Sequence, residues 1–119
     1  MSAVGRGAWV EDERLMDAVT GVSGSGPAYV FLVIEGLTQA GIDMGLSREL
    51  SAELAVTTVA GAGALALGAD VDAAELRRRV TSPGGTTEAA LGVLMGDNGL
   101  VELMTEAVRA ATERGRELA

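Results

Sequence analysis

The chain has 119 residues, 48% of them hydrophobic, and is therefore long enough to form one domain with a sizeable core. Its net charge of −8 at pH 7, and the lack of a basic stripe interleaved with aromatic residues, argue against a nucleic acid or an anionic membrane as a partner. The absence of cysteine and histidine excludes disulfides, thiol nucleophiles, imidazole bases and the usual zinc ligand sets, so we expect no metal site.

The aromatic residues are few: Trp9, Tyr29 and Phe31. The core must therefore be built from aliphatic side chains, with many alanines and glycines. Each small side chain buries little apolar area, although it lets helices approach closely. We therefore expect the chain to bury further surface against a second copy of itself.

Residues 1–10 show no periodicity and are interpreted as the remnant of a linker, which leaves residues 11–119 as the folded domain. A cationic start followed by a long apolar stretch, as in a signal peptide, is missing. No unbroken apolar run approaches the ~18 residues needed to cross a bilayer. These features predict a soluble, cytoplasmic protein without a membrane partner.

The first half of the chain reads as three helices. A short helix is predicted over residues 11–20 and an interruption over 21–27. Residues 28–44 have helical apolar spacing, with Pro27 in the first turn and Gly45 as terminator, although the apolar run at 29–34 alone would also suit a buried strand. Ser47 is a predicted N-cap for a helix over 48–67, whose small residues suit tight helix packing.

Three further helices are predicted over residues 70–80, 88–96 and 100–118, with a turn at 96–99. The last helix has a clear apolar stripe, and strand-like alternation is not convincing anywhere in the chain. The prediction is an all-α domain of about six helices without an internal repeat.

Two loops stand out because each places glycines, hydroxyl residues and a proline directly before an apolar helix: VSGSGPAY at 22–29 and TSPGGTTEAAL at 81–91. A helix start leaves backbone N–H groups unpaired and carries partial positive charge, and glycines let a ligand approach the backbone. Such a loop can bind a small anion without a basic side chain. Taken alone, each loop is better explained by plain helix capping, which in the second loop would come from Ser82 or Thr86. Two such loops in one short chain shift the interpretation toward a shared ligand cleft.

Other motifs are weaker. Gly61 and Gly63 loosely match a dinucleotide fingerprint, but the required preceding strand is missing, so packing explains them better. The basic triplet at 77–79 reads as a solvated face that could also raise the local potential for an anion.

The two loops, in this order and at this distance, resemble pyrroline-5-carboxylate reductase. The resemblance is carried by DAVTGVSGSGPAYVF at 17–31 and VTSPGGTTEAAL at 80–91, with AGIDMGLSRELSAELA between them, and extends from about Val4 to the end of the chain. It implies an enzyme that transfers a hydride from NADPH or NADH to 1-pyrroline-5-carboxylate to form L-proline. It also implies a helical domain, like the C-terminal domain of 6-phosphogluconate dehydrogenase, which intertwines with a second subunit into a homodimer and can assemble into decamers.

The resemblance also implies roles for individual residues. By position, Ser82, Gly85 and Thr86 would bind the substrate carboxylate, Thr87 would bond the ring nitrogen as the catalytic contact, and Ser25 would border the nicotinamide of the cofactor. A Rossmann domain does not precede these motifs in the chain, so we expect the chain alone to supply dimerisation and the carboxylate loop, without bound cofactor or turnover.

Two alternatives stay open at this point. One is a purely structural helical dimerisation module whose loops only cap helices. The other is the helical domain of a different two-domain dehydrogenase, which the combination of both motifs disfavours.

Overall fold

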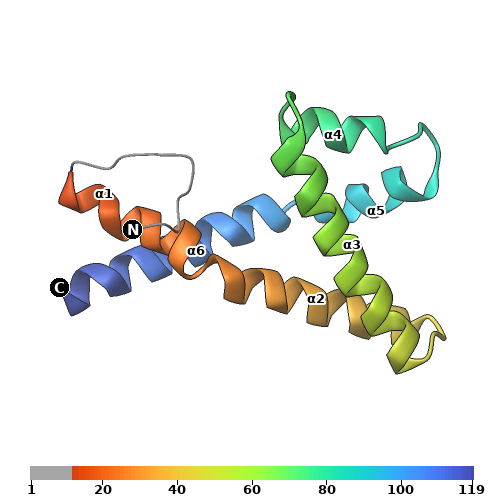
Figure 1. Cartoon of the computed structure of the whole chain (residues 1–119), viewed down its shortest axis with the longest axis horizontal. Helices are drawn as coiled ribbons and strands as arrows, with labels where there is room; N and C mark the ends of the chain where they lie inside the picture. Colours follow the sequence, from red (N-terminus) through yellow and green to blue (C-terminus); the bar gives the residue numbers. More distant parts are fainter. Residues whose placement is uncertain (1–11) are drawn as a thin grey trace. The chain divides into compact units, whose positions relative to one another are not determined.

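A computed structural model describes residues 12–119, which form helices and no strand (Figure 1). The six α-helices and one π-helical turn within this range are α1 (Glu13–Val19), η1 (Thr20–Gly24), α2 (Gly26–Asp43), α3 (Arg48–Gly68), α4 (Ala73–Arg79), α5 (Thr86–Leu94) and α6 (Leu100–Leu118). The predicted all-α fold of about six helices is confirmed. The predicted linker at residues 1–10 lies outside the described residues.

The chain forms two compact units. Within the described residues, the first comprises residues 12–29 together with Val93–Ala119, and the second comprises Val30–Gly92.

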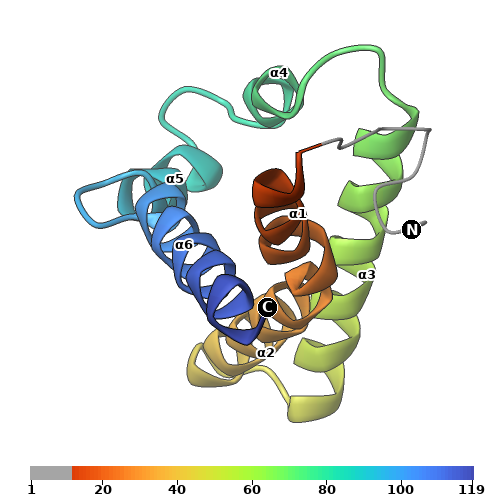
Figure 2. The same cartoon turned by 90° about the vertical axis from the view of Figure 1, so that its left-hand side faces the viewer.

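In the first unit, α1 and η1 pack closely against α6, and Figure 2 shows α1 beside the C-terminal part of α6. Two glycines allow this approach. A Cβ on Gly21 would lie 2.7 Å from the Thr112 hydroxyl, and one on Gly115 would lie 3.0 Å from a carboxylate oxygen of Asp17. The helices lie close together at these two points because neither glycine adds a side chain to the one that already faces it, Thr112 opposite Gly21 and Asp17 opposite Gly115.

The predicted interruption at residues 21–27 is wrong for most of its length. Helical turns continue through η1, and the chain bends only at Ser25 before α2 begins at Gly26. Gly21 stays helical because it fits directly against α6, a contact with a distant segment that no local pattern reveals. Pro27 occupies the first turn of α2, as predicted.

In the second unit, α2 and α3 form a tight helical hairpin. Gly45 lies in the turn after α2 and adopts φ of 108°, which ends the helix. Ser47 caps α3 by accepting a hydrogen bond from the Leu50 amide at 3.2 Å. The two helices touch where Ser51 donates to the carbonyl of Thr38 at 2.7 Å. Both local signals, the glycine and the serine, act as predicted.

The starts of α4 and α5 also differ from the sequence prediction. α4 begins at Ala73 rather than residue 70, because the carboxylate of Asp72 accepts from the Glu75 amide and caps the helix there. α5 begins at Thr86, two residues before the predicted start at residue 88. The second difference matters for the site, because it brings both threonines of the loop into the first helical turn.

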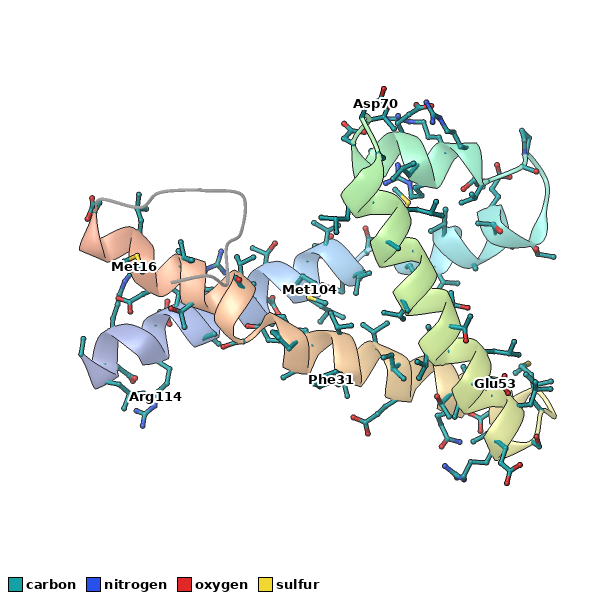
Figure 3. All side chains as sticks on the ribbon, viewed as in Figure 1. Met16, Phe31, Glu53, Asp70, Met104 and Arg114 are labelled. Carbon is teal, nitrogen blue, oxygen red and sulfur yellow. The ribbon has the colours of Figure 1, made fainter. Side chains whose placement is uncertain are left out.

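The described part of the chain has almost no apolar core of its own. Ala55 is the one hydrophobic residue that it buries, whereas Phe31 is 62% exposed and Leu65 is 70% exposed. Figure 3 shows side chains extending from the helices along their lengths. This exposure agrees with the expectation that apolar surface is to be covered by a second copy.

The segments Leu15–Asp43 and Arg48–Gly68 are long and apolar enough to cross a membrane by length and composition alone. The sequence analysis did not identify these two segments, because it considered unbroken apolar runs only. A helix that packs inside a soluble assembly passes the same test, so this is weak evidence for a membrane location.

Candidate functional site

The loop between α4 and α5 is a compact turn that leads directly into a helix. The amide of Gly85 donates to the carbonyl of Ser82 at 3.0 Å, and Gly84 adopts φ of 72°. A left-handed φ of this kind suits glycine, which has no Cβ to clash with the following carbonyl. The turn thus depends on Gly84 and directs the chain into α5 at Thr86.

Four of the five residues predicted for the site lie together in this stretch. Ser82 and Gly85 form the turn, and Thr86 and Thr87 form the start of α5; Ser82 and Thr86 are exposed, while Gly85 and Thr87 are partly covered. The first amides of a helix have no intrahelical acceptor and carry the positive end of the helix dipole. The arrangement offers a small anion backbone N–H groups and hydroxyls within one turn.

One amide of the turn is already bonded to a carboxylate. The Glu88 side chain accepts a hydrogen bond from the Gly84 amide at 3.1 Å. Glu102 does the same at the start of α6, where it accepts from the Asn98 amide at 2.9 Å. Because the same bond recurs where no ligand loop is predicted, ordinary capping explains it. Sequence reasoning missed Glu88, although a glutamate in the first turn of a helix is a capping signal.

Ser25, the fifth predicted site residue, lies in the other unit, at the bend between η1 and α2. Its amide donates to the carbonyl of Thr20 at 2.8 Å and its carbonyl accepts from the Ala28 amide at 3.1 Å. The hydroxyl of Tyr29 donates to the carbonyl of Gly21 at 2.6 Å. Sequence reasoning also missed this tyrosine contact, because Tyr29 reads simply as part of an apolar run.

Comparison with known proteins decides the family. The family model described as pyrroline-5-carboxylate reductase dimerisation matches residues 13–118. The chain belongs to this family. The chain is 52% identical over 119 residues to the pyrroline-5-carboxylate reductase of Pseudomonas aeruginosa, and 50% identical over 106 residues to that of a Synechocystis species.

Solved structures agree with this assignment to the reductase family. A pyrroline-5-carboxylate reductase from Coxiella burnetii matches with a TM-score of 0.88 and 44% identity, over 93% of this chain and 41% of that one. The Plasmodium falciparum pyrroline carboxylate reductase with NADP bound matches with a TM-score of 0.81 and 41% identity, over 87% of this chain and 39% of that one.

The chain spans only part of these relatives. All of it aligns with 43% of the Pseudomonas enzyme, and 89% of it aligns with 39% of the Synechocystis enzyme. The matched part carries the family's dimerisation function, so the chain contributes to a homo-oligomer.

The remaining sequence motifs add no second site. Gly61 and Gly63 lie inside α3, and no strand precedes them in the described range, so the dinucleotide fingerprint is not formed. Arg78 and Arg79 both pair with Glu75, at 3.0 and 3.2 Å, which fits a solvated helical face. Among residues 12–119, no group of three or more acidic side chains lies close enough together to hold a metal ion.

Proposed function

We propose that the chain is the dimerisation and substrate-binding domain of a pyrroline-5-carboxylate reductase, which reduces 1-pyrroline-5-carboxylate to L-proline with NADPH or NADH. The observation that carries the proposal is the 52% identity to the Pseudomonas enzyme over all 119 residues. The turn before α5 supports it, because its geometry suits a small carboxylate.

The proposed binding mode follows from the position of α5. The substrate carboxylate lies at the N-terminal end of the helix, within reach of Ser82, Gly85 and Thr86, where amide hydrogens and the helix dipole stabilise negative charge. The Gly85 amide already donates to the carbonyl of Ser82 in this conformation, so the Thr86 amide is the better placed of these two backbone donors.

Thr87 is the proposed contact to the ring nitrogen. A threonine hydroxyl is a poor acid, so its role is to orient the imine by hydrogen bonding. The dinucleotide supplies the hydride when it is bound, and the task of these residues is to position the substrate. Ser25 borders the nicotinamide in this proposal. The lack of histidine is no obstacle, because a ring imine can take its proton from solvent.

The proposed assembly is a homodimer in which the helices of two subunits intertwine, with decamers as a further step. The exposed apolar residues of α2 and α3 are the surface that such a dimer would cover. The same covering explains why apolar helices occur in a cytoplasmic enzyme without a membrane partner. The net charge of −8 supports the absence of a nucleic-acid partner.

The test is Thr87→Ala in the full-length enzyme that carries this domain. We expect kcat for imine reduction to fall at least about tenfold, because a contact made to the reacting ring is lost, while the dissociation constant for NADPH stays unchanged. Steady-state kinetics and dinucleotide fluorescence titration measure the two quantities.

Thr105→Ala is the matched control, since the Thr105 hydroxyl only bonds a carbonyl of its own helix, that of Val101 at 2.8 Å. Proline formation at the wild-type rate in Thr87→Ala would contradict the assignment. It would favour the alternative of a purely structural dimerisation module, in which the loop only caps α5.

A further inference from the structure

The π turn η1 leaves one backbone carbonyl without its helical partner. In an α-helix the carbonyl of Gly21 would accept from the amide of residue 25. Here the Ser25 amide donates to Thr20 instead, at 2.8 Å, which is the longer spacing of a π turn. The carbonyl of Gly21 accepts from the hydroxyl of Tyr29, at 2.6 Å. Tyr29 therefore supplies the donor that the change in hydrogen-bond register removed.

Gly21 is also the point where η1 is anchored to the rest of its unit. It is buried, and a Cβ there would lie 2.7 Å from the Thr112 hydroxyl and 3.1 Å from the carbonyl of Val108 on α6. A buried carbonyl is costly to leave unpaired. The Tyr29 hydroxyl, in the first turns of α2, thus connects the start of α2 to a backbone position that α6 holds in place.

Ser25 lies in the chain between Gly21 and Tyr29, the two residues that this hydrogen bond joins. Its amide is bonded back to Thr20 in η1, and its carbonyl is bonded forward to Ala28 in α2. The direction of the Ser25 side chain is therefore set by how η1 and α2 are held together. Single π turns of this kind occur frequently at functional sites.

We propose that Tyr29 is a positioning residue for the cofactor: its hydroxyl holds η1 against α2 and so fixes Ser25 toward the nicotinamide end of the dinucleotide. This inference rests on the proposed function, which supplies the role of Ser25. It adds a residue that acts through another and does not touch the substrate or the cofactor.

The test is Tyr29→Phe in the full-length enzyme, with NADPH and 1-pyrroline-5-carboxylate varied separately. The ring is kept and only the hydroxyl is removed. We expect KM for NADPH to rise about threefold or more, the size of effect that loss of one hydrogen bond produces, while KM for the imino acid stays unchanged. Thr38→Val, which removes a hydroxyl bonded to the carbonyl of Ile34 in the same helix, should change neither constant.

A double-mutant cycle separates positioning from general loosening of the fold. If Tyr29 acts through Ser25, then Ser25→Ala should raise KM for NADPH, and adding Tyr29→Phe should raise it no further. Circular dichroism and sedimentation confirm that each variant is folded and assembled.

The inference is overturned if the wild-type enzyme is active and Tyr29→Phe leaves KM for NADPH unchanged, raises both KM values equally, or multiplies the effect of Ser25→Ala. A full-length wild-type protein that forms no proline would overturn the proposed function, and this inference with it.

Discussion

At the scale of single residues, the turn before α5 depends on the backbone of Gly84. Its φ of 72° is strained for any residue with a Cβ, while a Cβ placed there would contact no other atom within 4 Å. Gly84→Ala should therefore lower the free energy of unfolding by about 1 kcal/mol through backbone strain alone. Urea unfolding followed by circular dichroism measures this cost.

Asparagine provides the matched control, because it tolerates the left-handed region better than other residues with a side chain. Gly84→Asn should cost clearly less than Gly84→Ala, although asparagine is the larger side chain. Equal losses in the two variants, or a larger loss for asparagine, would show that space rather than φ decides the identity of this residue.

At the scale of helices, the hairpin of α2 and α3 depends on one close contact. A Cβ on Gly41 would collide with the Ser51 hydroxyl and lie 3.1 Å from the Ser51 Cβ. Gly41→Ala should therefore destabilise the chain by about 1–3 kcal/mol, the usual cost of overpacking where atoms are already in close contact. Thermal and urea unfolding give the value.

Ser51→Gly tests whether this collision is the cause. Alone it removes the hydrogen bond to Thr38 and should destabilise the hairpin. Combined with Gly41→Ala it also removes the colliding atoms, so the double variant should be more stable than the sum of the single changes predicts, by at least about 1 kcal/mol. Strictly additive changes in the free energy of unfolding would mean that the added Cβ at residue 41 does not collide with Ser51.

The helices that the sequence predicts well are those with local signals at their ends. Ser47 and Gly45 set the start of α3 and the stop after α2, and both act on neighbours in the chain. The π turn η1 was missed because Gly21 is held by α6, far away in the sequence. For the site, glycines and hydroxyls indicated the turn before α5, whereas the contacts of Glu88 and Tyr29 depend on where a flexible side chain points.

At the scale of the whole molecule, the chain buries too little apolar surface to be stable as described. Within residues 12–119 its one buried hydrophobic residue is Ala55, which contributes little area, while side chains such as Leu32 and Leu65 are about two-thirds exposed. Single domains of this length normally bury most of the apolar surface that their unfolded chains expose. We expect the missing burial to come from a second subunit, as the dimerisation family implies.

Folding and association should therefore occur together. If so, the melting temperature rises with protein concentration, because mass action favours the assembled state, and sedimentation equilibrium gives at least a dimer.

Phe31→Glu should weaken assembly by at least about tenfold, since it replaces an apolar side chain that is 62% exposed in the single chain by a charged one. Thr105→Glu adds the same charge at an exposed polar position of α6 and should assemble like the wild type. A monomer whose melting temperature does not depend on concentration would contradict this view, because the apolar helices would then be stable without a partner to cover them.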